Sequence, residues 1–150
     1  MELLPQFPGL EIDWRPCEAH PRPESHGRHS DLCARGMYIA QEAGVDLSEY
    51  HRRMYDIALT DRADVEDSNI IAGAVEGLSD RDAFLTALKN DSFEDVLFEN
   101  NRLVWDEYDC PAVPSFRLNG QLLMSEQGVG VSKEELEAFI RRLTRPNSPA

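Results

Sequence analysis

The sequence lacks any long hydrophobic run, because no stretch of about 18 apolar residues is present. We therefore expect no membrane-spanning helix, and the N-terminal residues lack the basic and apolar regions of a signal peptide. Basic residues are also scarce, since 15 Lys and Arg stand against 28 Asp and Glu and the net charge is −13. Phosphate binding needs clustered positive charge, so this balance argues against nucleic acid and membranes as partners. We predict an acidic, cytoplasmic protein.

Cysteine is scarce as well, and the spacing of the cysteines argues against dithiol–disulfide catalysis by this chain. The chain has three cysteines, Cys17, Cys33 and Cys110, and no Cys-x-x-Cys pair. An odd number of distant cysteines does not indicate a disulfide framework. A dithiol oxidoreductase needs one thiolate at a helix N-terminus and a second cysteine close enough to resolve the mixed disulfide. The sequence therefore predicts no catalytic residue.

A zinc site is the alternative use of the first two cysteines. Sulfur and imidazole ligands suit zinc, and the relevant residues are Cys17, His20, His26, His29 and Cys33. Their spacing fits no compact zinc signature, and the first histidines lie in a proline-rich loop. We predict neither a metal site nor a cofactor.

With 150 residues, 41% of them hydrophobic and 29% charged, the chain has the composition of one globular domain. Capping residues followed by apolar stripes predict helices in its middle and at its end. These helices are expected to begin near Ser30 or Asp31, Ser48, Asp64 or Asp67, Ser79, Ser92 and Ser132. The apolar and polar residues of Leu10–Arg15 alternate, which predicts a short strand.

Asn119-Gly120 is the strongest local signal in the chain. A type I′ turn needs a positive φ at both central residues, and this dipeptide supplies it. A two-residue loop there places Leu118 opposite Gln121 and Phe116 opposite Leu123. The sequence therefore predicts a β-hairpin.

The segment Val113-Pro114-Ser115-Phe116, followed by Asn119-Gly120, resembles the Val-Pro-Ser/Thr-Phe and Asn-Gly motif of the DsbA-like branch of the thioredoxin superfamily. The resemblance extends to Leu10–Pro16 as the family's second strand and to His20-Pro21 after it. It also extends to Ala63–Leu78 and Asp80–Lys89, which are similar to the family's inserted helices. The resemblance implies that the Val113–Pro114 peptide bond is cis.

The fold class implied by this resemblance is α/β, a thioredoxin-like fold with an inserted helical block (DsbA-like) that lacks the family's first strand. A single domain then spans residues 1–150. Its thioredoxin part comprises residues 1–16 and 110–145, and the helical insertion with the connecting helix comprises residues 30–109. The family's Cys-x-x-Cys follows that first strand, so the chain is expected to be a truncated or redox-inactive form.

The function implied by the resemblance is thiol–disulfide oxidoreduction, without a catalytic pair in this chain. Val113 and Pro114 are the expected substrate-binding residues, at which the Val113 backbone pairs with an extended thiol or disulfide peptide or with glutathione. One alternative is a glutathione-binding isomerase or transferase of the kappa-like branch. Another is a non-catalytic interaction module with the same fold.

Two further predictions concern Cys110 as a redox thiol and an open sheet edge as a dimer interface. Cys110 lies shortly before Pro114 and could form a mixed disulfide, although a small buried hydrophobe is the more common role of a free cysteine. In the family, a strand lies between Leu10–Arg15 and the strand that begins at Ser115. Its absence leaves an open edge, at which a homodimer could form through shared strands.

Overall fold

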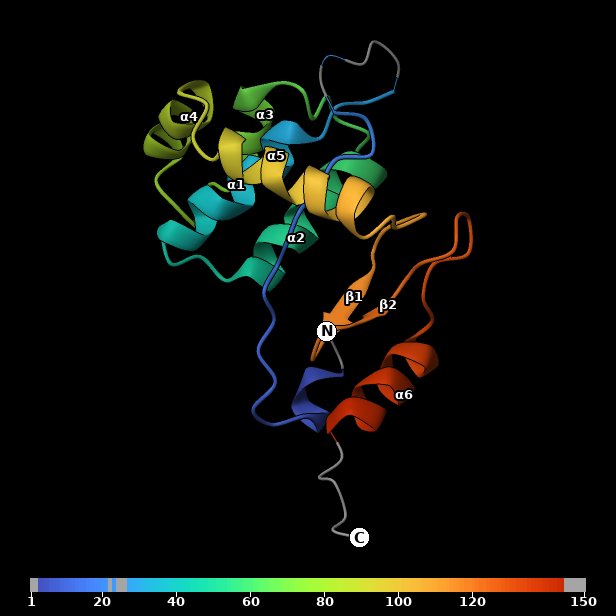
Figure 1. Ribbon diagram of the computed structural model, residues 1–150. Helices are drawn as coiled ribbons and strands as arrows, with labels where there is room; N and C mark the ends of the chain where they lie inside the picture. Colours follow the sequence, from blue (N-terminus) through green and yellow to red (C-terminus); the bar gives the residue numbers. More distant parts are fainter. Residues whose placement is uncertain (1–2, 22, 24–26, 145–150) are drawn as a thin grey trace, which may run out of the picture. The chain divides into compact units, whose positions relative to one another are not determined.

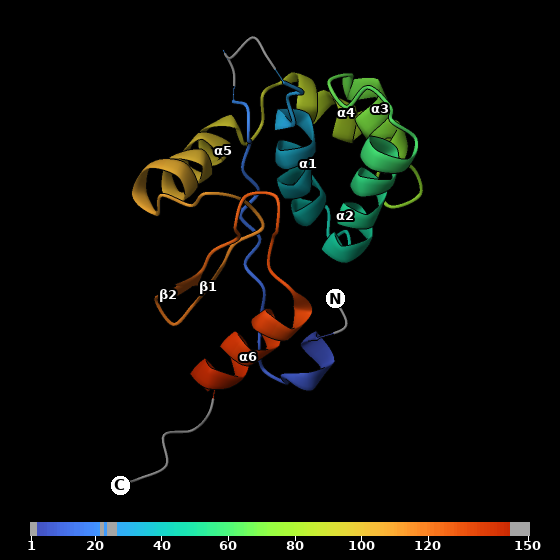
Figure 2. The same cartoon turned by 90° about the vertical axis from the view of Figure 1, so that its right-hand side faces the viewer.

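The computed structural model describes residues 3–21, 23 and 27–144 (Figures 1 and 2). The chain divides into two compact units. Unit 1 comprises residues 1–10 and 104–150, and unit 2 comprises residues 11–103. In chain order the elements are η1 (Leu4–Gln6), α1 (Asp31–Glu42), α2 (Leu47–Tyr55), η2 (Asp56–Thr60), α3 (Ser68–Ala74), α4 (Arg81–Lys89), α5 (Glu94–Asn101), η3 (Arg102–Glu107), β1 (Phe116–Leu118), β2 (Gln121–Leu123) and α6 (Lys133–Thr144). The structure thus combines helices with a small antiparallel sheet.

The helices of unit 2 lie where the capping patterns predict them, but several begin one or two residues away. Asp46, and not Ser48, caps α2, since its side chain accepts hydrogen bonds from two backbone N–H groups of the first turn. Asp80, and not Ser79, likewise caps α4. Aspartate and serine are comparable N-cap residues, so the pattern alone does not choose between neighbours.

Helices α1 to α4 are grouped together in Figure 1, and their apolar side chains form the core of unit 2. The most deeply buried of them are Met37, Ala40, Tyr50, Ile71, Ala72, Val75, Phe84 and Leu88. Each of the larger side chains stabilises the fold by about 1.5–3 kcal/mol through removal from water. All of these residues lie within unit 2, between Met37 and Leu88.

The predicted strand at Leu10–Arg15 is wrong. The segment is extended, but in the part of the chain that the structure describes it joins no β-ladder. Ile12 is exposed. Trp14 packs on the unit 2 core and against the ring of His51, with 4.4 Å between the ring centroids. Side-chain contacts, and not strand pairing, therefore hold this segment.

Two asparagines of α5 continue this anchoring. Asn100 Nδ2 donates to the carbonyl oxygen of Pro16 at 2.9 Å and to the Tyr38 hydroxyl at 2.8 Å. Asn101 Oδ1 accepts from the Glu18 N–H at 2.8 Å, and its Nδ2 donates to Glu18 Oε2 at 3.0 Å. We refer to the bonds between Asn101 and Glu18 as the Asn101 clamp. The two amide side chains thus pair backbone groups just after the Leu10–Arg15 segment.

Unit 1 contains the predicted hairpin in the predicted register. Phe116 faces Leu123 and Leu118 faces Gln121, and both residues of the Asn119-Gly120 turn have positive φ. The helix α6 begins with the predicted capping box, in which Ser132 and Glu135 exchange hydrogen bonds.

η1 lies beside α6 in both views, and this contact belongs to unit 1 (Figures 1 and 2). The guanidinium of Arg141 is 5.1 Å from the Phe7 ring centroid and donates to Gln6 Oε1 at 3.1 Å. The Asn119 side chain also donates to the Leu143 carbonyl oxygen at 3.2 Å. The helix α6, the hairpin and η1 therefore form one packed unit.

Among the described residues, no helix has the length and apolar character that crossing a membrane requires.

Candidate functional site

The segment that joins η3 to β1 contains the residues predicted to bind substrate. The peptide bond between Val113 and Pro114 is cis, as predicted from the motif. Both side chains are exposed, and 43% of Val113 is accessible. The structure therefore places these two residues at the surface of unit 1, just before the hairpin. We call residues 110–115 the Val113 loop.

Two serines hold the Val113 loop against the end of β2. Ser125 is fully buried, its hydroxyl donates to the carbonyl oxygen of Pro114, and its N–H donates to Ser115 Oγ at 3.0 Å. Ser115 Oγ donates in turn to the carbonyl oxygen of Ala112 at 2.8 Å. The Ser125 hydroxyl donates a hydrogen bond to the loop, and the Ser115 hydroxyl accepts one and donates another. These bonds fix the conformation of the loop backbone.

The polar groups of the Val113 backbone have no hydrogen-bond partner among the described residues. Within residues 3–21, 23 and 27–144, neither its N–H nor its carbonyl oxygen forms a hydrogen bond. The Arg117 backbone is also unpaired with β2. Leu118 and Gln121 flank the two-residue turn and form a hydrogen-bonded pair, so the next pair, Arg117 and Leu122, directs its N–H and C=O groups away from the partner strand. In the described part of the chain, β1 pairs with β2 alone. Within those residues no β-ladder occupies its other edge.

Unit 1 exposes apolar side chains in the Val113 loop and after β2. Met124 follows β2 and precedes the Ser125 that is bonded to the loop, and 38% of Met124 is exposed. Val129, on the turn closed by the bridge between Glu126 and Gly130, is 78% exposed. Unit 1 thus presents Val113, Met124 and Val129 to solvent.

Cys110, the predicted alternative redox thiol, is only 7% exposed. Its N–H donates to the carbonyl oxygen of Val104 at 3.0 Å and so closes the end of η3. A thiol needs access and thiolate character to attack a disulfide. The burial of Cys110 favours its interpretation as a small core residue.

Among the described residues, neither Cys17 nor Cys33 forms a disulfide bond. Burial, reinforced by the nearby Asp31 carboxylate, raises the pKa of the Cys33 thiol to about 12. Such a thiol stays protonated near neutral pH and is a poor nucleophile. Among the described residues, no three Cys, His, Asp or Glu side chains are grouped as a metal site requires. His26, one of the zinc ligands considered, lies outside the described residues.

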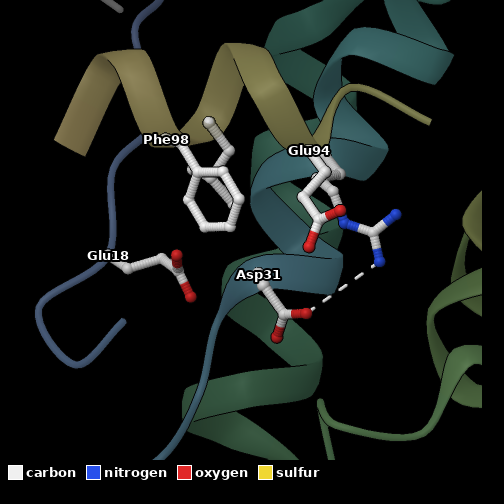
Figure 3. Close-up of a pocket in the computed structure, with 6 residues that line it drawn as sticks. Glu18, Asp31, Glu94 and Phe98 are labelled. Atoms are coloured by element: carbon white, nitrogen blue, oxygen red, sulfur yellow. Dashed lines mark ion pairs between the residues drawn. The ribbon is translucent and has the colours of Figure 1, made fainter. Parts of the chain in front are cut away.

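Unit 2 contains a small hollow that sequence reasoning did not identify. Its lining comprises Glu18, Asp31, Arg35, Glu94, Leu97 and Phe98. The carboxylates of Glu18, Asp31 and Glu94 turn toward this hollow, as Figure 3 shows.

The charged groups of the hollow are structural in character. Arg35 is buried, and its Nη1 donates to the carbonyl oxygens of Leu88 at 3.1 Å and Ser92 at 3.3 Å. Its Nη2 lies 3.9 Å from the Asp31 carboxylate. Glu18 is held by the Asn101 clamp. We therefore interpret the hollow as the place where Arg35 joins α1 to the residues around α4.

The residues that sequence reasoning missed are the bracing serines. Ser115 belongs to the recognised motif, but Ser125 follows the hairpin with no periodic or capping signal. The two-residue turn offers one indirect clue, because it brings the residues that follow β2 back beside those that precede β1.

Comparison of the chain with known family models, characterised proteins and solved structures found no match.

Proposed function

We propose that this chain binds extended polypeptides at the Val113 loop, as a thiol–disulfide oxidoreductase of DsbA-like fold does, without a catalytic dithiol of its own. The observation that carries the proposal is the unpaired backbone of Val113 within a loop braced by Ser115 and Ser125. Pairing of main-chain groups with an extended chain gives affinity that is largely independent of sequence. Thiol or disulfide peptides are the corresponding partners.

The open edge of β1 supports the same proposal. An unpaired edge is a template for a further strand, and the backbone of Arg117 directs its polar groups away from β2. A second copy of the chain is one occupant of this edge, and the resulting homodimer forms part of the proposal. A bound peptide and a second copy compete for the same hydrogen bonds.

Glutathione is the second candidate ligand. Its short backbone could pair with Val113, which is the basis of the isomerase or transferase alternative. The exposed apolar side chains beside the loop favour a longer peptide, because glutathione has few apolar atoms to place against them. The loop therefore fits a polypeptide better than it fits glutathione.

The test is an NMR titration of the ¹⁵N-labelled protein with reduced, alkylated insulin B chain, under reducing conditions. Bound peptide is expected to shift the amide resonances of Val113, Ser115 and Arg117 in a saturable way. The same peptide N-methylated at alternate residues should bind at least tenfold more weakly, because it lacks the backbone donors. Saturating peptide that moves no resonance in residues 110–118 would refute the proposal.

Two variants sharpen this test. Ser125→Ala removes the hydroxyl that donates to Pro114 and should weaken binding by loosening the loop. Val113→Ala removes exposed apolar area at the site, whereas Val96→Ala removes a similarly exposed valine from α5 in unit 2. Binding should fall for the first valine variant and stay unchanged for the second.

A further inference from the structure

We propose that residues 11–18 form a strap on unit 2, and that the Trp14 end of this strap is released when the His51 ring becomes positively charged. The strap directly follows Leu10, the last residue of the first segment of unit 1, so it connects the two units along the chain. In the part of the chain that the structure describes, the strap joins no β-ladder. Contacts with side chains of unit 2 therefore hold it in place.

Hydrogen bonds from α5 hold the C-terminal end of the strap. The Asn101 clamp binds both the N–H and the carboxylate of Glu18. Asn100 Nδ2 donates to the carbonyl oxygen of Pro16 at 2.9 Å. These groups are uncharged or are bonded through an amide, so this end of the strap does not depend on the charge of a histidine.

Ring packing holds the Trp14 end of the strap. The half-buried Trp14 side chain packs on the unit 2 core and against the ring of His51 in α2, with 4.4 Å between the ring centroids. His51 Nε2 is buried and has no hydrogen-bond partner among the described residues. A buried polar atom without a partner is satisfied by water only when the contact opens.

A positive charge on the His51 ring makes this contact unfavourable. In the neutral ring one nitrogen needs no proton, whereas in the charged ring both nitrogens are donors. Nε2–H would then be a buried cationic donor without an acceptor. The Trp14 ring attracts a cation, but it replaces neither the lost water nor an acceptor. Burial accordingly lowers the pKa of His51 from 6.5.

The charged groups on the two elements that contact the ring are already engaged. In the strap, the Asp13 carboxylate lies 2.8 Å from the guanidinium of Arg15. In α2, the Glu49 carboxylate accepts hydrogen bonds from the two arginines that follow His51. Tyr50, whose ring is 5.8 Å from that of His51 between centroids, stays neutral because burial raises its pKa. None of these groups supplies a free negative charge to the ring.

The direction of the response to pH follows from this difference in solvation. In the released strap the His51 ring meets water and has a pKa of about 6.5, whereas burial keeps its pKa lower in the closed strap. Protons therefore favour the released form as the pH falls below 6.5. The ratio of released to closed strap rises by up to about tenfold per pH unit until the pKa of the closed form is reached.

The experiment measures cleavage of the full chain by chymotrypsin after Trp14, at pH 7.5 and at pH 5.5. Each rate is divided by the rate for a free peptide of residues 10–18 under the same conditions, which removes the pH dependence of the protease. Cleavage of a briefly opened segment follows the population of its open form. The normalised rate should rise by about three- to tenfold from pH 7.5 to pH 5.5.

Cleavage after Phe84, a core residue that is 1% exposed, is followed in the same samples. It should be much slower than cleavage after Trp14, because it requires unfolding of the core and not release of the strap. Equal normalised rates at the two sites would overturn the proposal, since the strap would then open only together with unit 2.

Two variants separate His51 from other groups that respond to pH. His51→Phe keeps a ring against Trp14 without a titrating nitrogen, so the rise in cleavage should disappear. Asp13→Asn, the matched control, removes a carboxylate from the strap itself and should leave the rise unchanged. A rise that persists in His51→Phe, or that disappears in Asp13→Asn alone, would overturn the proposal.

A measurement on the unsubstituted chain does not depend on how these variants fold. An NMR titration of the His51 ring protons gives the pKa of the ring directly, and the value should lie below 6.5. A His51 ring that titrates at or above 6.5 would overturn the proposal, because the charged ring would then strengthen the contact with Trp14.

Discussion

Replacing Asn101 by alanine should destabilise unit 2 more than any exposed asparagine does. The substitution removes both hydrogen bonds of the Asn101 clamp, one to the Glu18 N–H at 2.8 Å and one to its carboxylate at 3.0 Å. Both residues are buried, and only 2% of Glu18 is exposed. Water therefore cannot replace the lost partner without opening the structure.

The size of the effect follows from these two bonds. A buried polar group left without a partner costs about 1–3 kcal/mol, so losing two bonds costs about 2–5 kcal/mol. Alanine is the better helix former by roughly 0.5 kcal/mol, which offsets a small part of this cost. The expected net loss is about 2–4 kcal/mol, a large fraction of the roughly 5–15 kcal/mol that stabilises a typical domain.

Urea denaturation followed by circular dichroism measures this loss as a shift of the midpoint at unchanged slope. Asn90→Ala is the matched control, because Asn90 is exposed at the C-terminus of α4. Asn101→Asp tests the donor alone, since it retains an acceptor for the Glu18 N–H but places a carboxylate against the Glu18 carboxylate. Its stability at pH 7 should fall at least as far as that of Asn101→Ala and should recover on acidification.

An Asn101→Ala protein within about 0.5 kcal/mol of the control would refute the reasoning, because surface substitutions commonly fall within that range. An Asn101→Asp protein as stable as the unsubstituted chain at pH 7 would also refute it. Either result would mean that Glu18 finds equivalent partners when the amide is absent.

Three further predictions concern packing, pH and redox activity. Gly36→Ala should destabilise the chain by about 1–3 kcal/mol in urea, because its Cβ would overlap the Tyr50 hydroxyl; Gly73→Ala, with open space around the Cβ, should leave stability equal or higher. Burial lowers the pKa of His51 below 6.5, so the neutral ring stabilises the fold fully above pH 6.5 and this contribution is lost as the pH falls toward the folded-state pKa. The urea midpoints at pH 7.5 and pH 5.5 should therefore differ less in His51→Phe than in the unsubstituted chain. An unchanged difference would contradict this assignment. The chain should not accelerate insulin reduction by dithiothreitol, since its cysteines do not form a Cys-x-x-Cys pair; turnover that disappears in Cys110→Ser would overturn this.

Local signals predicted the parts of the fold that local physics controls. The hairpin register follows from Asn119-Gly120, because few dipeptides accept positive φ at both positions. The start of α6 follows from Ser132 and Glu135, whose side chains reach each other within one helical turn. Both features depend on residues that are neighbours in sequence, and the structure confirms both.

The predicted strand at Leu10–Arg15 was wrong because strand formation depends on residues that are distant in sequence. The alternation in Leu10–Arg15 is typical of a strand, yet a strand exists only where a partner supplies a ladder. In the structure the chain after it is anchored through Pro16 and Glu18 by the two asparagines of α5. In the sequence those asparagines are recognisable only as poor helix formers. No local signal shows that their amides bind the backbone of Pro16 and Glu18.

The sequence by itself determined the position of the candidate site, because Val113 and Pro114 belong to a recognisable motif that directly precedes a strong turn. Only the tertiary structure decided which residues of that site are exposed and which hydrogen bonds hold its backbone. The buried Ser125 returns from the far side of the hairpin to brace the loop, and Cys110 is covered while Val113 is left exposed. Burial and long-range hydrogen bonds depend on which segments meet in space, and a pattern read along one chain cannot supply that information.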